Sequence, residues 1–213
     1  GLRKSYRSGG LRIEVLRGVD IALGAGESVS IRGESGSGKS TLLNLLAGLD
    51  TPDGGNLSWG GEPAQANRRA TFLGIVFQSF YLIPEIDALA NVLMAARMVK
   101  APGAAERARA QDLIARVGLA ERATHLPAQL SGGERQRVLL ARALAVQAPV
   151  VLMDEPIANL DPPHQVDWLE QVRCLTEQHT TVISVLHEVG MALHADEVVV
   201  MQAGHVVHQG ASA

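Results

Sequence analysis

The chain has 213 residues, of which 46% are hydrophobic, and its formal net charge at pH 7 is −3. This length suits one folded domain, and this hydrophobic content excludes a disordered chain. The weakly acidic balance gives no electrostatic reason to expect nucleic acid as a partner. The single cysteine, Cys174, excludes an internal disulfide and indicates a reducing compartment. We find no signal-peptide segment and no apolar run near the roughly 20 residues of a membrane span, so we expect a cytoplasmic protein.

The first third of the chain is predicted to form short strands around one helix. Alternating or continuous apolar residues predict three strands, at 13–16, 19–23 and 28–32. A glycine-rich loop then precedes a predicted helix at about 41–49. A short hairpin is predicted within 56–63, and the run LGIVFQ predicts a buried strand that ends at Gln78.

The middle of the chain, about 79–146, changes to helical patterns separated by proline and glycine. Strand patterns return in PVVLM, TTVISVL and EVVVM, with a predicted helix at about 163–178 between the first two. Strand, helix and strand in this order favour a parallel sheet. We therefore predict one α/β domain over 1–213, in which a helical lobe interrupts a core of about 1–78 and 147–213.

The segment GESGSGKS follows a predicted strand and precedes a predicted helix. It fits the pattern G-x-x-x-x-G-K-[ST] of loops that bind nucleoside triphosphates. Its glycines, Gly33, Gly36 and Gly38, would leave room for a phosphate chain beside backbone amides, and unpaired amides at the helix start favour anions. Lys39 would add a charge at the β- and γ-phosphates, and the Ser40 hydroxyl suits Mg²⁺. Many classes of NTPase share this loop, so it predicts a ligand and not yet a function.

The segment VVLMDEP places two carboxylates where a buried strand ends. Ligands of open α/β sheets bind at the carboxyl ends of the strands. Asp154 is therefore predicted to hold Mg²⁺, directly or through water, and Glu155 to act as the general base toward the attacking water. Taken alone, the same pair would also suit a helix N-cap, but the glycine loop favours the metal and base roles.

The segment LSGGERQR places a hydroxyl and two glycines at the start of a predicted helix. Ser131 and Glu134 form a capping box, which by itself is an ordinary helix start. A capping box leaves Gly132 and Gly133 unexplained, because adjacent glycines cost helix stability. We interpret this segment as a second helix start that binds anions.

Together these segments resemble the ATP-binding subunits of ABC transporters, and the resemblance covers essentially the whole chain with its motifs in family order. GESGSGKS resembles the Walker A loop, LSGGERQ the ABC signature and VVLMDEP the Walker B strand. FQ at 77–78 resembles the Q-loop, ANLD at 158–161 the D-loop, His187 the switch histidine and Tyr6 the aromatic residue that stacks on adenine. The resemblance implies a P-loop NTPase core with a mainly parallel sheet, an N-terminal antiparallel β subdomain and an inserted α-helical subdomain.

The resemblance also implies an ATPase that uses ATP and Mg²⁺ in a head-to-tail homodimer, in which the signature of one subunit faces the Walker A loop of the other. The implied catalytic residues are Glu155, His187 and Gln78. The implied metal ligands are Ser40, Gln78 and Asp154. The implied nucleotide-binding residues are Tyr6, Gly33, Glu34, Ser35, Gly36, Ser37, Gly38, Lys39, Ser40, Thr41, Ser131, Gly132, Gly133, Glu134 and Asp161.

In this family the ATP-binding subunits dock on an integral membrane permease. The resemblance therefore implies a peripheral location on the cytoplasmic face of the inner or plasma membrane, with no nucleic-acid partner. Two positions depart from the usual family pattern, Ile157 after DEP and Glu188 after the switch histidine. Neither removes a catalytic group, so we expect an active ATPase.

The sequence gives mixed indications of the transporter branch. GSGKSTLLNLLAGLDTPDGG and FQSFYLIPEIDALANV resemble the lipoprotein-release and macrolide-export branch, whereas VISVLHEVGMALHADEVVVMQAGHVVHQG resembles importers of siderophores, haem and cobalamin. We favour the first branch, because its matching residues include the usual docking surface for the membrane subunit. A non-transport ABC ATPase is a further alternative, although the interval between Ser40 and Ser131 leaves no room for the long coiled coil of the DNA-repair and chromosome forms. A P-loop kinase would not need the signature.

Overall fold

The structure, a computed structural model, describes residues 1–76, 82–97, 103–158 and 160–212. A six-stranded sheet forms its centre, in the strand order β10–β9–β3–β8–β7–β6. The bounds are β3 Ser28–Gly33, β6 Leu73–Val76, β7 Val150–Asp154, β8 Thr181–Val185, β9 Glu197–Gln202 and β10 His205–Ala211. Neighbouring strands are parallel except for β10, which runs antiparallel to β9. The mainly parallel sheet predicted from the sequence is confirmed.

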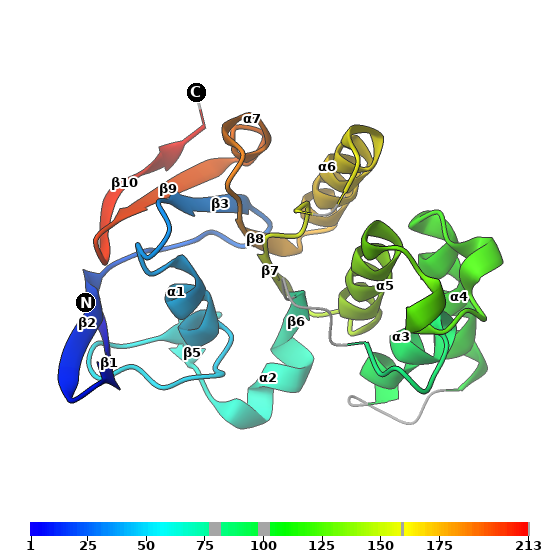
Figure 1. Ribbon diagram of the computed structural model, residues 1–213, viewed down its shortest axis with the longest axis horizontal. Coiled ribbons are helices and arrows are strands. Elements are labelled where there is room, and N and C mark those ends of the chain that lie inside the picture. Colours follow the sequence, from blue (N-terminus) through cyan, green and yellow to red (C-terminus); the bar gives the residue numbers. More distant parts are fainter. Residues whose placement is uncertain (77–81, 98–102, 159, 213) are drawn as a thin grey trace.

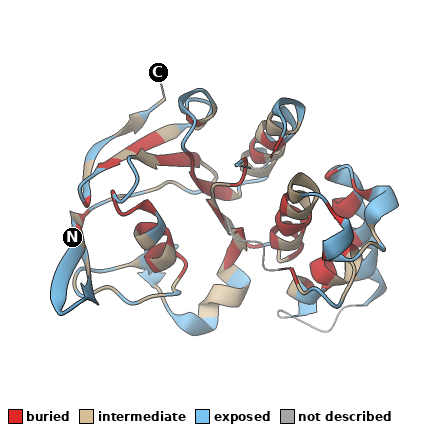
Figure 2. Cartoon of the chain, viewed as in Figure 1, coloured by how far each residue is buried: buried red, intermediate tan, exposed pale blue. Residues whose placement is uncertain are grey.

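Helices cover both faces of this sheet (Figure 1). Helix α1, Lys39–Leu46, packs on one face, and α6, Pro162–Glu177, and the short α7, Val189–Ala192, pack on the other. Successive residues of β8 alternate between the two layers, so Val182 joins the apolar cluster under α6 and Ile183 joins the cluster under α1. Covering on both faces explains why the central strands are continuous apolar runs. Figure 2 shows the buried residues concentrated there.

The N-terminal residues form a hairpin of β1, Leu2–Ser8, and β2, Leu11–Val19. Gly9 and Gly10 make its turn with φ angles of 58° and 82°, which two-residue hairpin turns require. The sequence analysis did not predict β1, and its strand at 19–23 was wrong beyond Val19. Ile21 and Leu23 instead pack against the core from a loop, so their alternation reflects burial and not strand pairing.

A second, shorter hairpin follows α1, as the sequence predicted. It consists of β4, Ser58–Trp59, and β5, Glu62–Pro63, which pair antiparallel, and α2, Ala66–Phe72, comes next. The indole Nε1 of Trp59 donates to the carbonyl oxygen of Leu46 at 3.0 Å, so this hairpin is tied to the end of α1. The two hairpins are the antiparallel β part that the family resemblance implied.

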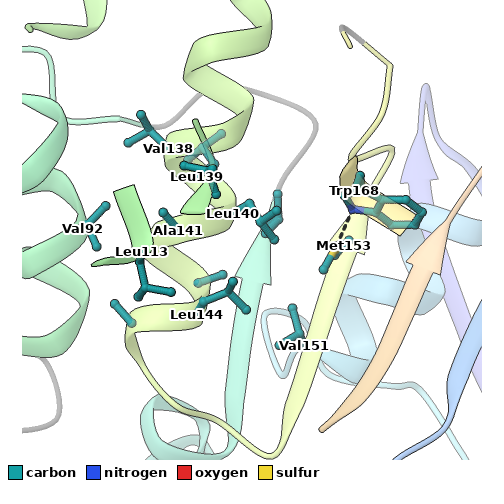
Figure 3. Packing of buried hydrophobic residues seen from close by; sticks show 14 of the residues in the cluster. Val92, Leu113, Val138, Leu139, Leu140, Ala141, Leu144, Val151, Met153 and Trp168 are labelled. Atoms are coloured by element: carbon teal, nitrogen blue, oxygen red, sulfur yellow. Dashed lines mark hydrogen bonds between the residues drawn. The ribbon is translucent and has the colours of Figure 1, made fainter. Parts of the chain in front are cut away.

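The helical lobe lies in the chain between β6 and β7. Its helices are α3 Ala88–Arg97, α4 Ala104–Arg116 and α5 Gly132–Ala145, with 3₁₀ turns at Ala120–Arg122 and Pro127–Gln129. Val92, Leu113 and Leu139, one from each helix, belong to one buried cluster (Figure 3). Helix α5 also packs against β6, which joins the lobe to the sheet. Of the helices in the described ranges, none is long and apolar enough to cross a membrane.

Candidate functional site

The loop between β3 and α1 presents backbone amides at the carboxyl edge of the sheet. Helix α1 begins at Lys39, and its N-cap Gly38 has a left-handed φ of 102°. No side chain of the described residues caps this helix start. The first amides of α1 are therefore available to an anion, and the helix dipole favours negative charge at this position.

The three loop glycines have different structural causes. A Cβ atom on Gly33 would lie 2.1 Å from the carbonyl oxygen of Met201, and one on Gly38 would lie 2.7 Å from Leu16 Cδ2. Gly36 has a φ of 80°, and no described atom lies within 4 Å of its added Cβ. The sequence analysis assigned all three glycines to room for phosphates, and the structure shows an additional cause at two of them. Gly33 and Gly38 allow contact with β9 and β2, whereas Gly36 faces open space.

Lys39 places its ammonium group inside this loop. The side chain is buried, and Nζ donates to the carbonyl oxygens of Gly33 at 2.8 Å and Glu34 at 2.9 Å. Burial lowers the pKa of Lys39, while the nearby charges of Glu155 and Asp154 oppose that shift. The structure therefore holds a cation at the position where the sequence predicted contact with phosphates.

Asp154 ends β7 and meets Ser40 from the first turn of α1. Burial raises the pKa of Asp154, as does the charge of Glu155, and a hydrogen bond with Ser40 opposes both effects. Asp154 Oδ1 is buried and has no hydrogen-bond partner among the described residues. An unpartnered carboxylate oxygen beside a hydroxyl fits the oxygen-rich coordination that Mg²⁺ takes.

Glu155 and His187 meet where β7 and β8 end. The two strands are adjacent and parallel, with Asp154 opposite Val185, so the residues that follow them lie at the same edge. The Nε2 atom of His187 lies 2.6 Å from Oε1 of Glu155. Glu155 also has a left-handed backbone, with a φ of 49°. That conformation is strained for a residue with a Cβ atom, and strain of this kind gathers at functional sites. The sequence analysis did not anticipate it.

Tyr6 lies beside α1, on the first strand of the N-terminal hairpin. Its hydroxyl donates to Asp50 Oδ2 at 2.8 Å, and it also has a hydrogen bond with Thr41. Partial burial raises the pKa of Tyr6, as does the bond to Asp50. Tyr6 is 40% exposed, so it presents surface to solvent beside α1.

The signature segment starts α5, and Ser131 is its N-cap. Ser131 Oγ accepts from the backbone N–H of Glu134 at 3.1 Å, and the Glu134 carboxylate accepts from the backbone N–H of Ser131 at 2.7 Å. The capping box read from the sequence is therefore present, with Gly132 and Gly133 as the first two helical residues. This helix start belongs to the lobe, whereas α1 packs against β3, β7 and β8 of the central sheet and against β2 of the N-terminal hairpin (Figure 1).

The sequence also predicts Gln78 and Asp161 as site residues. Gln78 lies outside the described residues. Asp161 is at the N-cap position of α6, exposed, and its side chain makes no capping hydrogen bond with the described residues. Within one chain, the structure thus brings together Lys39, Ser40 and Asp154, with Glu155 and His187 beside them.

Comparison with known proteins decides the family. The family model described as ABC transporter matches residues 16–158. The chain belongs to this family. A lipoprotein-releasing system ATP-binding protein LolD of Pseudomonas fluorescens is 44% identical over 97% of this chain and 94% of its own. A macrolide export ATP-binding/permease protein MacB 2 of Aeromonas hydrophila is 39% identical over 97% of this chain and 33% of its own length.

Solved structures of ABC cassettes superpose on essentially the whole of this chain. The dimeric ATP-binding cassette MJ0796, in a post-hydrolysis state with ADP and Pi, superposes with a TM-score of 0.94. The alignment spans the whole of this chain and 97% of the cassette, at 33% identity. The cbiO1 protein of Clostridium perfringens, part of a cbiONQ transporter complex, has a TM-score of 0.86 and 27% identity. The predictions of an ABC-type ATPase, of its fold and of its ATP ligand are confirmed.

Proposed function

We propose that this ABC ATPase drives the release of lipid-anchored proteins from a membrane, through a permease subunit. The observation that carries the proposal is similarity to proteins named lipoprotein-releasing system ATP-binding protein, at 42–44% identity over 97% of this chain. Macrolide export is a second candidate, favoured by 39–42% identity to MacB proteins, of whose length the chain spans about a third. Both belong to the branch favoured from the docking region of the sequence.

The chemistry proposed for the residues that one chain contributes follows from their geometry. The amides of α1 and the Lys39 ammonium take the β- and γ-phosphates. Ser40 and Asp154, together with Gln78, would hold Mg²⁺, which neutralises phosphate charge when bound. Glu155 accepts the proton of the attacking water, and His187 orients the Glu155 carboxylate at 2.6 Å.

The remaining nucleotide contacts are proposed in the same way. Tyr6 stacks on adenine through its exposed ring face. Glu34, Ser35, Ser37 and Thr41 border the phosphate chain within or beside the glycine loop. The signature of a second copy, Ser131–Glu134, closes the site over the γ-phosphate.

A head-to-tail homodimer is the proposed assembly. Support comes from the placement of the two proposed phosphate-binding helix starts, at α1 on the sheet and at α5 on the lobe of one chain. Two copies arranged head to tail would pair each α1 with the partner's α5, and Asp161 would lie at the interface. The dimeric MJ0796 cassettes are consistent with this arrangement. The proposed location is peripheral, on the cytoplasmic face of the membrane that holds the permease.

Reconstitution tests the transport proposal. The chain would be co-purified with any multi-span membrane protein whose gene neighbours its own, and the complex would be placed in proteoliposomes that contain a triacylated reporter protein. ATP should release the reporter into solution, and the reporter should stimulate ATP turnover. Stimulation by a macrolide without reporter release would support the second candidate. Co-purification with an importer-type permease would overturn both.

A further inference from the structure

Asp50 joins the proposed adenine platform to the loop after α1. Its Oδ2 atom accepts from the Tyr6 hydroxyl at 2.8 Å. Its Oδ1 atom accepts from Lys4 Nζ at 2.5 Å and from the backbone N–H of Thr51 at 2.7 Å. Lys4 Nζ also donates to the carbonyl oxygen of Thr51 at 2.8 Å. Both carboxylate oxygens of Asp50 are therefore used, one for the aromatic residue and one for the ammonium that holds the carboxylate in place.

Lys4 also contacts the Tyr6 ring itself. Its Nζ lies over the ring, 5.2 Å from the centroid, at a distance where a cation and an aromatic face attract. One face of the ring is thus occupied by the chain's own ammonium, and the hydroxyl is fixed by Asp50. A stacked base would then use the opposite face, whose orientation is set by these two contacts.

The loop that carries Asp50 is docked by other bonds. The backbone N–H of Arg3 donates to the carbonyl oxygen of Gly54 at 2.9 Å, and that of Asp53 donates to the carbonyl oxygen of Arg3 at 2.8 Å. Asp53 Oδ2 also accepts from the backbone N–H of Ser5 at 2.9 Å. These contacts hold the loop against β1 independently of Asp50. Asp50 adds a tie to β1 through Lys4, and it also contacts the Tyr6 hydroxyl.

The charges agree with this arrangement. The hydrogen bond from Lys4 lowers the pKa of Asp50, and the same bond raises the pKa of Lys4. The carboxylate therefore stays ionised and the ammonium stays protonated at neutral pH. A hydrogen bond from a phenol to an ionised carboxylate is stronger than one between neutral groups.

We propose that Asp50 is a positioning residue for the base-stacking ring of Tyr6. This inference rests on the proposed role of Tyr6 at the nucleotide base. Asp50 holds the hydroxyl end of the ring in place before ATP arrives, so less side-chain freedom is lost when the base stacks. The effect concerns the base alone. Contacts with the triphosphate come from the loop at Lys39 and do not pass through Asp50.

The experiment compares ATP with inorganic tripolyphosphate, which has no base, by calorimetry on the intact chain. Asp50→Ala should weaken ATP binding about three- to tenfold, the usual cost of ordering one side chain on binding, and leave tripolyphosphate binding unchanged. Tyr6→Phe removes the same bond from the other side, together with the bond between the hydroxyl and Thr41, so it should weaken ATP binding at least as much. The double variant should lose no more than Tyr6→Phe alone. Asp53→Ala, a carboxylate on the same loop without a contact to Tyr6, should leave the ratio of the two affinities unchanged.

The outcomes distinguish a failure of the Asp50 role from a failure of the Tyr6 stacking role on which it rests. Equal losses for ATP and tripolyphosphate in Asp50→Ala, or additive losses in the double variant, would overturn the positioning role. Tyr6→Ala provides the reference for the whole stacking contribution. If Tyr6→Ala leaves the ratio of affinities unchanged, the stacking role itself fails. If Tyr6→Ala lowers ATP affinity selectively while Asp50→Ala and Tyr6→Phe do not, only the role of Asp50 fails.

Discussion

Glu155→Gln is expected to separate ATP hydrolysis from ATP binding. The substitution keeps the shape of the side chain and removes its basic oxygen. A glutamine can retain the 2.6 Å contact with His187, because its amide oxygen accepts from Nε2–H. The phosphate-binding groups are elsewhere, in the glycine loop and at Lys39, so the affinity for ATP should survive.

The expected loss is that of a general base, roughly 10²–10⁴-fold in turnover. At about 1.4 kcal/mol for each factor of ten, this corresponds to about 3–5.5 kcal/mol in the barrier. The assay measures phosphate release at saturating Mg-ATP, with ATP affinity from calorimetry and dimer lifetime from light scattering. A negative charge near the γ-phosphate is removed, so the ATP-bound dimer should last longer. Asp154→Asn is the matched comparison, because it should weaken the metal site and with it the binding of Mg-ATP.

The backbone of Glu155 provides a second, independent observable. Its left-handed φ of 49° costs about 1–2 kcal/mol for a residue with a Cβ atom, and glutamine pays the same cost. Glu155→Gly relieves this strain, while glycine loses about 0.5–1 kcal/mol more in chain entropy on folding. The unfolding free energy of Glu155→Gly should therefore be equal to that of the original chain or up to about 1.5 kcal/mol higher, while hydrolysis is lost. Wild-type turnover in Glu155→Gln would remove the residue from the mechanism. Loss of ATP binding in the same variant would make it a structural or metal-binding group.

Four further outcomes are expected. Lys39→Ala should weaken ATP binding tenfold or more, at roughly 1.5–3 kcal/mol for hydrogen bonds to a charged group, and unchanged calorimetric affinity would contradict the loop assignment. Tyr6→Ala should weaken ATP binding more than Tyr6→Phe, since the ring provides most of the stacking; equal losses would assign Tyr6 a hydrogen-bonding role only. Gly38→Ala should lower the melting temperature more than Gly36→Ala, because its Cβ would lie 2.7 Å from Leu16 whereas Gly36 faces open space; the reverse order would refute this distinction. Chains carrying Glu155→Gln should be monomeric without nucleotide and dimeric with Mg-ATP, and adding Ser131→Ala should weaken the dimer. Light scattering that showed no mass change with ATP would argue against a shared site.

The parts of the fold that the sequence predicted are those whose burial follows a local pattern. The strands β7, β8 and β9 are continuous apolar runs because helices cover both faces of the sheet. The hairpin strand β1 has no such pattern. Of its residues only Leu2 is buried, and it forms a strand because it pairs with β2 and not because its own sequence alternates. The edge strand β10 is likewise mostly exposed and defined by pairing with β9.

In the candidate site, the sequence predicted which residues take part but not the tertiary contacts that hold them. Motif spacing named Lys39 and Asp154, and the structure brings their side chains into one region. Two of the features that spacing missed involve neighbours distant in sequence. Gly33 is confined by Met201 on β9, and the Tyr6 hydroxyl is held by Asp50. Contacts of this kind depend on tertiary packing and have no local signal.

The two helix starts of the proposed dimer site differ in whether side chains cap their backbone amides when no nucleotide is bound. At the signature, the capping box satisfies the backbone amides of Ser131 and Glu134, and the Ser131 amide lowers the pKa of the Glu134 carboxylate, which also pairs with Arg122 at 3.4 Å. An ionised carboxylate at this position competes with a phosphate for the same amides. At α1 no described side chain caps the amides, and Lys39 adds a positive charge. The nucleotide should therefore bind the α1 side first, because nothing there must be displaced. Only the bound triphosphate then offers enough negative charge to draw the capped signature of a second copy, so association follows ATP binding rather than preceding it.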